Sequence, residues 1–231
     1  QLQLSASDFS DLERYIDVKR GEIYLAKGVI FVEGVSEEYL LPSFAKAMGY
    51  ELDRLGIVVC NVNSTNFVPY RKFADALGLP FVILTDGDYY HQVEEKIKFG
   101  DLASEDDVGF GYNGIDRSIN FSGIADMIET YLASEYEEGT TFDDLEIEDQ
   151  IEFFRRIGIF IGEHTFEVDI FSKCGSATSD EEQIICRVFD ELTEGGQQQK
   201  QNFKNRMSNG EYNKCLAQIE SSYSQIGKGR F

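Results

Sequence analysis

Residues 28–38, GVIFVEGVSEE, decide the fold of this chain, because an apolar run ends there abruptly at a glutamate and a glycine. The four residues 29–32 are β-formers without polar alternation, which is typical of a strand buried on both faces of a parallel sheet. Glu33 ends the run, and Gly34 allows the backbone to turn sharply. The stretch therefore predicts a buried strand followed at once by a tight turn.

A helix is expected directly after this turn. Ser36 can cap it, and Glu37 and Glu38 fall in its first turn, where negative charge is favourable. We expect the helix over residues 37–48, with Glu38 facing solvent and one apolar face made of Leu40, Leu41, Phe44, Ala45 and Met48.

Residues 81–88, FVILTDGD, repeat the plan of an apolar run that ends in carboxylates. A strand is expected over 81–84, and between the two runs we expect a strand over 56–62 and a helix over 68–77. This β-α-β-α-β order with short connections predicts a parallel sheet with right-handed crossovers. The fold class is therefore α/β.

Four carboxylates follow the ends of these strands, on Glu33, Glu37, Asp86 and Asp88. Ligands of open α/β sheets gather at the carboxyl ends of the strands, so the four would surround one crevice and could hold a divalent metal ion. Simpler interpretations remain open. Glu33 can merely end a strand, Glu37 can merely favour a helix start, and an Asp-Gly pair is common in turns.

The composition is that of a globular protein with one sizeable core, or one core with a helical appendage. No apolar run of 18 residues and no leader pattern is present, which argues against a membrane partner. The chain opens with Gln1 rather than Met, so we expect it to be part of a longer protein. A cytoplasmic protein with reduced thiols is expected, because no CxxC spacing joins Cys60, Cys174, Cys186 and Cys215.

The net charge of −21 argues against a nucleic-acid-binding protein that relies on a basic surface of its own. The acidic residues can form a solvated surface, or bound metal ions that face phosphate can neutralise some of them. A neighbouring domain could also supply a basic surface. Charge alone does not choose between these interpretations.

The later part of the chain is less regular. We expect a short helix over 8–19, little regular structure over 89–120, and a helix over 119–133. The acidic stretch 135–149 should begin another helix, residues 157–161 should form a strand, and residues 180–192 and 197–223 should be mostly helical. His91 and His164 have no zinc spacing and are interpreted as bystanders.

The combination of motifs resembles the topoisomerase–primase (Toprim) fold, and in finer detail the C-terminal Toprim region of the OLD (overcoming lysogenization defect) family of nucleases. The VEGxSE motif of that family matches residues 32–37, and its DGD motif matches residues 86–88. A later Thr/Ser-x-Glu motif matches residues 165–167, and a late lysine matches Lys228. The resemblance covers roughly residues 20–231.

This resemblance implies a metal-dependent DNA endonuclease that uses two Mg²⁺ or Mn²⁺ ions, with an ABC-type ATPase domain preceding the Toprim region. In one branch of the family a helicase-like partner acts beside the protein. Carried over residue by residue, Thr165 would lie beside the ions, Lys228 would be the catalytic cation, and the metal-site carboxylates would be those of Glu33, Glu37, Asp86, Asp88 and Glu167. Five carboxylates without clustered Cys or His suit Mg²⁺ or Mn²⁺ rather than zinc. Glu163 and Asp169 are weaker candidates, and Lys228 can also be an ordinary solvated charge.

The resemblance also suggests how the chain is divided. We expect an N-terminal helix or linker (1–20), a Toprim α/β core (21–116), a helical insertion (117–156), a Toprim strand with the Thr-Phe-Glu motif (157–178), a helical segment (179–222) and a C-terminal segment with Lys228 (223–231).

Two other functions stay open from the sequence. One is another Toprim activity, of the topoisomerase or primase type, although none of the 12 tyrosines stands in a motif that marks a strand-passage nucleophile. The other is a non-enzymatic metal- or phosphate-binding regulatory module, similar to a receiver domain. The VEGVSE stretch and the additional Glu167 fit that module poorly.

Overall fold

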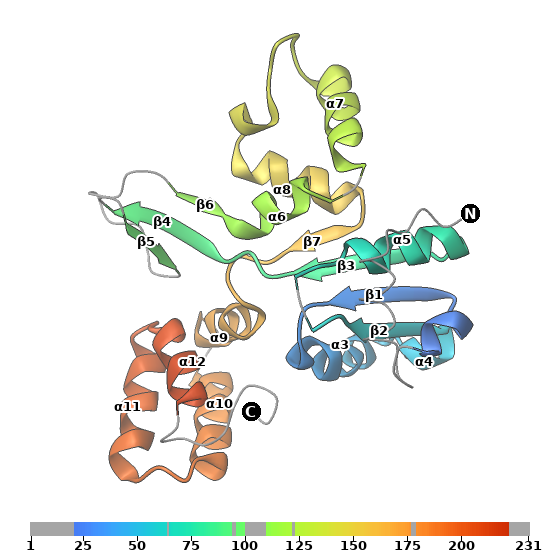
Figure 1. Ribbon diagram of the computed structural model, residues 1–231. Coiled ribbons are helices and arrows are strands. Elements are labelled where there is room, and N and C mark those ends of the chain that lie inside the picture. Colours follow the sequence, from blue (N-terminus) through green and yellow to red (C-terminus); the bar gives the residue numbers. More distant parts are fainter. Residues whose placement is uncertain are drawn as a thin grey trace. The chain divides into compact units, whose positions relative to one another are not determined.

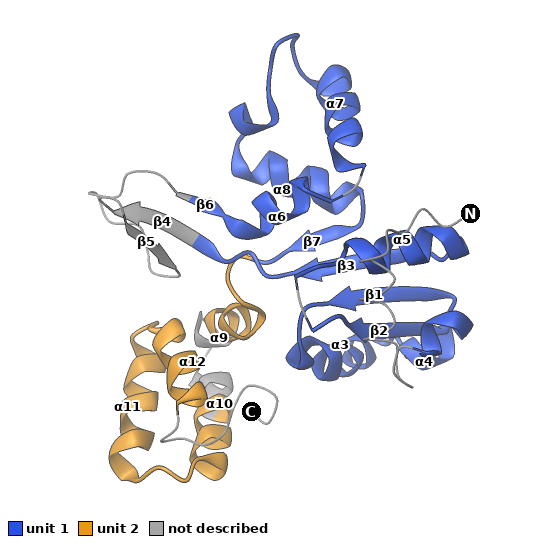
Figure 2. Ribbon diagram, in the orientation of Figure 1, with its two compact units in different colours: residues 1–89, 111–162 blue, residues 90–110, 163–231 orange. Residues whose placement is uncertain are grey.

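A computed structural model describes residues 21–63, 65–93, 96–99, 110–121, 123–176 and 179–221 (Figure 1). The chain divides into two compact units (Figure 2). Unit 1 comprises Gln1–Tyr89 and Gly111–Gly162, and unit 2 comprises Tyr90–Phe110 and Glu163–Phe231. The helix expected over 8–19 and the expected catalytic Lys228 lie outside the described residues.

Unit 1 contains a four-stranded parallel sheet in the order β2-β1-β3-β7. Its strands are β1 (Gly28–Val32), β2 (Ile57–Asn61), β3 (Phe81–Thr85) and β7 (Ile159–Ile161). Val32 pairs with both Asn61 and Leu84, so the carboxyl ends of the first three strands lie level at one edge. The parallel α/β sheet predicted from the sequence is confirmed.

The helical elements of unit 1 are η1 (Glu22–Leu25), α3 (Val35–Ala47), α4 (Leu52–Leu55), α5 (Val68–Leu77), α6 (Asn113–Ile119), α7 (Ile124–Glu135), η2 (Phe142–Asp144) and α8 (Ile147–Arg156). The chain crosses from β1 to β2 through α3 and then returns past β1 to β3 through α5. Because right-handed crossovers in opposite directions use opposite faces of a sheet, a topological switch point arises between β1 and β3. The turns after β1 and β3 meet at that point.

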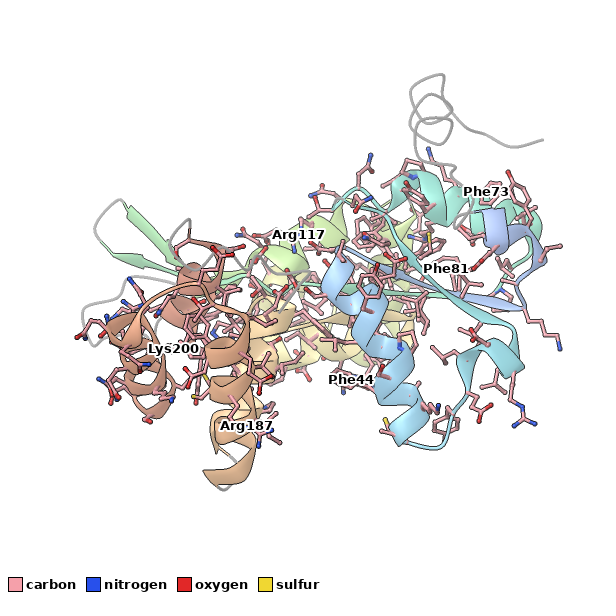
Figure 3. All side chains as sticks on the ribbon, turned by 90° about the horizontal axis from the view of Figure 1, so that it is seen from below. Phe44, Phe73, Phe81, Arg117, Arg187 and Lys200 are labelled. Carbon is pink, nitrogen blue, oxygen red and sulfur yellow. The ribbon has the colours of Figure 1, made fainter. Side chains whose placement is uncertain are left out.

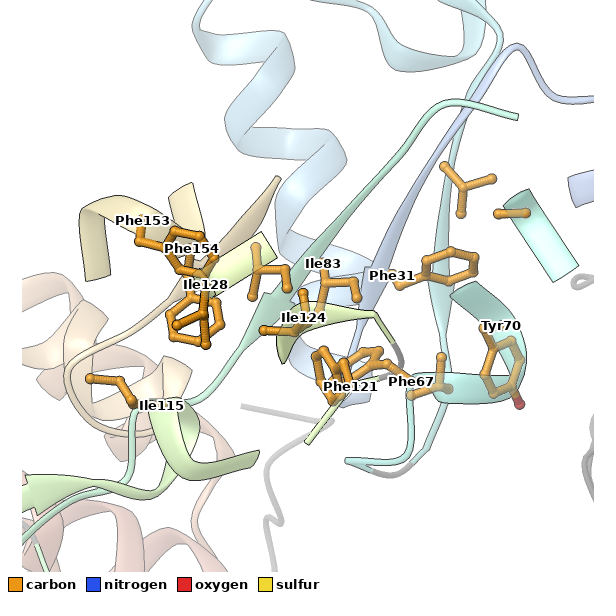
Figure 4. Close-up of a cluster of buried hydrophobic side chains, with 14 of the residues drawn as sticks. Phe31, Phe67, Tyr70, Ile83, Ile115, Phe121, Ile124, Ile128, Phe153 and Phe154 are labelled. Atoms are coloured by element: carbon orange, nitrogen blue, oxygen red, sulfur yellow. The ribbon is translucent and has the colours of Figure 1, made fainter. Parts of the chain in front are cut away.

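The core of unit 1 lies between the sheet and helices α5 to α8 (Figure 4). Phe31 and Ile83 from the central strands are completely buried, and Phe67, Ile124 and Phe154 pack into the same cluster. No residue of β1 or β3 is exposed, which agrees with strand sequences that show no polar alternation.

Helix α3 confirms the helix expected after the first strand, but most of its expected apolar face is exposed. Leu40, Phe44 and Met48 are 37%, 41% and 74% exposed, and Phe44 is labelled on α3 in Figure 3. Among the residues of α3, the most shielded line is instead Glu37, Leu41 and Ala45, at intervals of four. Helix α3 contacts β2, and the shielded side of the helix carries the carboxylate of Glu37 in place of the expected apolar residues Leu40, Phe44 and Met48.

The expectation of little regular structure over 89–120 is wrong. This part contains β4 (Tyr89–Val93), β5 (Lys96–Phe99), β6 (Phe110–Tyr112) and helix α6, and β4 pairs with β5 in antiparallel fashion. Strand β4 reads YYHQV and β5 reads KIKF. Such polar, short strands lack the apolar run by which the buried strands were recognised.

Unit 2 is helical in its later part, with α9 (Phe166–Ser176), α10 (Ser179–Leu192), α11 (Gln197–Ser208) and α12 (Tyr212–Glu220). The helix expected over 197–223 is divided in two, because Gly210 adopts φ 72°, outside the helical region. The rings of Phe189 and Phe203 stack 4.0 Å apart at the centre of its core. Among the described helices, none is long and apolar enough to cross a membrane.

Candidate metal centre

Glu33 is the first residue after β1, and its carboxylate reaches across to the end of β3. Its Oε1 accepts a hydrogen bond from the Thr85 hydroxyl and another from the backbone N–H of Asp86, at 2.9 Å. These donors lie on the neighbouring strand end because Val32 pairs with Leu84. The sheet register therefore brings the VEGxSE and DGD motifs together, as their positions at strand ends predict.

Arg117 of α6 contributes a cation at this edge, and it was not among the residues predicted from the sequence. Its Nη1 lies 2.7 Å from Oδ2 of Asp88, and its Nη2 lies 3.4 Å from Oε1 of Glu33. Nη2 also donates a hydrogen bond to the main-chain oxygen of Asp86, at 2.6 Å. Arg117 is labelled in Figure 3. No sequence motif marks Arg117, and it follows the short strands β4 to β6, which show no apolar run.

The loop between β3 and β4 has an unusual backbone at Asp88, which adopts φ 47°. Aspartate tolerates this left-handed region better than most residues, although glycine is the usual occupant. The N–H of Gly114 donates to the main-chain oxygen of Gly87 at 2.9 Å, so the start of α6 lies directly against the loop. This contact fixes the loop on which both aspartates of the DGD motif are carried.

Burial raises the pKa of Glu33, whose side chain is only 14% exposed. The hydrogen bond from Thr85, the charge of Arg117 and the N–H of Asp86 act in the opposite direction and favour the charged form. The raised pKa shows that burial outweighs these three partners. A further positive charge near Glu33 would favour its ionised form.

Glu37 is buried, with 5% of its surface exposed. Its Oε2 lies close to Gly34, where an added Cβ would be 3.0 Å from that oxygen. The expectation that Glu38 faces solvent is wrong. Glu38 is half-buried and accepts a hydrogen bond of 3.4 Å from Nδ2 of Asn61, at the end of β2.

The donor set of unit 1 suits a hard divalent cation. Glu33 and Asp88 each direct one oxygen toward the guanidinium of Arg117. The guanidinium supplies the positive charge that two neighbouring carboxylates need. Within the described part of the chain, no donor is recorded for Oε2 of Glu33 or Oδ1 of Asp88. Oxygen donors of this kind are those that Mg²⁺ and Mn²⁺ prefer.

Thr165 and Glu167 belong to unit 2, at the start of α9. Oγ1 of Thr165 is buried, and among the described residues no hydrogen-bond partner is found for it. This unsatisfied hydroxyl fits a residue that has a ligand in the active protein. That Thr165 and Glu167 share a site with the carboxylates of unit 1 remains a prediction.

Asp169 holds the backbone just before α9 through hydrogen bonds of its side chain. Its two carboxylate oxygens accept the backbone N–H groups of Glu163 and His164, at 3.0 and 2.9 Å. Nδ1 of His164 lies 3.2 Å from Oδ1 of Asp169, and the hydrogen bond between them raises the pKa of His164. The carboxylate of Asp169 therefore stabilises the backbone at the start of α9.

Comparison with known proteins agrees with these motifs. A family model described as "Overcoming lysogenization defect protein-like, TOPRIM domain" matches residues 25–88, which run from the end of η1 to the last aspartate of DGD. Endonuclease GajA of Bacillus cereus is 30% identical over 96 residues, or 42% of this chain. The uncharacterized protein YbjD of Escherichia coli is 29% identical over 85 residues, or 37% of this chain. These matches cover only 14% and 15% of the two curated relatives.

Solved structures extend the likeness over nearly the whole chain. The C-terminal region of the Xanthomonas campestris OLD protein is 27% identical, with a TM-score of 0.59, over 91% of this chain and 82% of that one. The C-terminal region of the Burkholderia pseudomallei OLD protein is 25% identical, with a TM-score of 0.57, over 89% and 84%. In the matched domain, the overall fold and the motif residues, the chain is similar to the C-terminal Toprim regions of OLD proteins, and its residues 25–88 match the OLD-like Toprim domain.

Proposed function

We propose that this chain is the nuclease region of a larger ATPase–nuclease, and that it hydrolyses DNA phosphodiester bonds as an endonuclease with two Mg²⁺ or Mn²⁺ ions. The observation that carries the proposal is the convergence of Glu33 and Asp88 on one cation at the topological switch point of the sheet. The similarity to a protein named as an endonuclease supports DNA as the substrate. The curated relatives are longer than this chain, which supports a longer protein. The family resemblance suggests that an ABC-type ATPase domain precedes this region and that a helicase-like partner can act beside it.

The residues of unit 1 would bind and orient a divalent ion. Glu33, Asp86 and Asp88 would supply its ligands, while Thr85 and the Asp86 N–H hold Oε1 of Glu33 in place. Bound divalent ions would supply an activated water and neutralise charge that develops on the phosphate. The family motifs suggest that Glu37, Thr165 and Glu167 contribute further to metal binding and that Lys228 stabilises the transition state.

Cleavage of supercoiled plasmid tests the proposal directly. The chain is incubated with Mg²⁺, Mn²⁺, Ca²⁺ or EDTA, beside variants Glu33→Gln and Asp88→Asn, which remove one charge each with little change in shape. Asparagine also tolerates the left-handed backbone at position 88. Glu129→Gln, an exposed carboxylate on α7, is the matched control.

We expect nicked and linear products that require Mg²⁺ or Mn²⁺. Cleavage should persist in Glu129→Gln and fall by at least about 100-fold in both site variants. Cleavage that is unaffected by EDTA or by both site variants would contradict the proposal. Retained cleavage in Lys228→Ala would remove the lysine from the site. Should the wild-type chain leave plasmid intact in every metal, the assay is repeated with the full-length protein, and inactivity there would refute the nuclease assignment.

A further inference from the structure

Arg117 marks the candidate metal centre by its contacts, but the proposed reaction gives it no role. Its side chain is 24% exposed and lies between Glu33 and Asp88, whose side chains are 14% and 31% exposed. One guanidinium nitrogen contacts Asp88 at 2.7 Å, and the other contacts Glu33 at 3.4 Å and the main-chain oxygen of Asp86 at 2.6 Å. The positive charge of Arg117 is therefore shared between the two motifs of the candidate metal centre.

The contacts of Arg117 are incomplete for a permanent structural ion pair. Strong arginine–carboxylate pairs place two parallel N–H groups on one carboxylate, whereas Arg117 gives each carboxylate a single nitrogen. Its Nε is buried, and no acceptor for it exists among the described residues. A buried donor without an acceptor is unfavourable, which leaves Arg117 readier to move than a fully paired arginine.

A divalent ion held by Glu33 and Asp88 would compete with Arg117 for the same two carboxylates. Like charges that share two ligands repel each other, and the low exposure of the site leaves little water to screen them. The ion carries the larger charge and accepts more oxygen ligands. The guanidinium is therefore the group expected to leave.

We propose that Arg117 is a built-in counter-cation of the metal centre, which balances Glu33 and Asp88 in the metal-free protein and leaves them when a divalent ion binds. This inference rests on the proposed function, because it requires that unit 1 binds the ion. The affinity for metal is then lower than the carboxylates alone would give. In return, the carboxylate edge is held together before the ion arrives.

Calorimetric titration with Mn²⁺ separates this inference from the nuclease assignment, because it needs no DNA. The full chain is compared as wild type, Arg117→Gln, Arg117→Lys and Arg71→Gln, the last removing an arginine of α5 whose partner is the exposed Asp75. We expect Mn²⁺ to bind about tenfold more tightly to Arg117→Gln, within the range usual for coupled binding events. Arg117→Lys should bind about threefold more tightly, because a single ammonium cannot contact both carboxylates as the fork does. Arg71→Gln should match the wild type.

Thermal melting gives a second readout. In EDTA, Arg117→Gln should melt below the wild type, because the carboxylates then repel each other without a counter-charge. Saturating Mn²⁺ should raise the melting temperature of Arg117→Gln by more than that of the wild type, since the ion replaces the missing cation. A glutamine variant that folds only when Mn²⁺ is present supports the proposal in the same way.

Unchanged or weaker Mn²⁺ binding in Arg117→Gln would overturn the proposal, because Arg117 would then support the bound ion instead of competing with it. If the glutamine variant is unfolded with and without Mn²⁺, Arg117→Lys decides in its place, and weaker binding in that variant overturns the proposal. Absence of Mn²⁺ binding to the wild type would instead refute the metal centre itself, and with it the proposed function.

Discussion

At Gly114 the start of α6 leaves no space for a side chain. A Cβ at this position would collide with the main-chain oxygen of Asp86 and lie 2.7 Å from Cγ2 of Ile161. Both neighbours belong to the edge that carries the candidate metal centre. Neither can move without shifting β7 or the DGD loop.

We expect Gly114→Ala to lower the free energy of unfolding by about 1–3 kcal/mol, because overpacking against backbone cannot be relieved by a rotamer change. Urea unfolding followed by circular dichroism measures the effect. Gly21→Ala is the matched control, since nothing lies within 4 Å of a Cβ there and its φ of −60° suits alanine. Equal stability of the two variants would show that the loop yields to the added methyl group.

Cys215 illustrates how burial sets reactivity in unit 2. The side chain is fully buried, and burial raises the pKa of its thiol to about 12. The thiolate is the reactive form, so at pH 8 the native protein should leave Cys215 unmodified by iodoacetamide for hours. Mass spectrometry of peptides after labelling, with a urea-unfolded sample as control, checks this. Rapid labelling of Cys215 in the native protein would contradict the burial described here.

At the scale of elements, the stack of Phe189 on Phe203 joins α10 to α11. Both rings are completely buried, and their planes are 2° apart. We expect Phe203→Ala to cost about 3–5 kcal/mol, through lost burial and the cavity that remains. Thermal unfolding followed by circular dichroism measures this loss of stability.

The control is Ile184→Ala, since Ile184 is 52% exposed on α10 and its replacement should change stability by no more than about 0.5 kcal/mol. Similar effects of both variants would exclude the stack as the centre of this core.

Some elements could be predicted from the sequence because local chemistry determines them. The helix over 68–77 matches α5 at both ends, where Pro69 favours the first turn and Gly78 adopts the left-handed conformation just after the last. The strands β4 and β5 could not be predicted, because β-pairing rather than an apolar run defines them. The exposure of Leu40, Phe44 and Met48 could not be predicted either, because tertiary packing decides which face of α3 meets the sheet.

At the scale of the whole molecule, the candidate site was only partly predictable. Glu33, Asp86 and Asp88 could be placed together because parallel strands end at one edge. Arg117 could not, because it comes from a helix 29 residues beyond Asp88 and no periodicity points it toward the sheet. Thr165 and Glu167 lie in the other unit, and only the family motif suggests that they serve the same chemistry.

The net charge of −21 leads to a prediction about DNA binding by the whole chain. Repulsion between this charge and phosphate should make binding of a DNA duplex undetectable in EDTA. Ca²⁺, which takes the same oxygen ligands, should restore measurable binding without requiring cleavage. Fluorescence anisotropy of a labelled duplex, at one fixed ionic strength, compares the two conditions. Binding of equal strength in EDTA would mean that a surface other than the metal centre holds the DNA.

Anomalous diffraction from crystals soaked in Mn²⁺ decides whether the strand ends of unit 1 form a divalent metal centre. We predict an anomalous peak within about 2.0–2.3 Å of carboxylate oxygens from Glu33, Asp86 and Asp88. Arg117 should then no longer lie 2.7 Å from Oδ2 of Asp88. The contradicting result is saturating Mn²⁺ with no peak at these carboxylates and with Arg117 still paired to Asp88.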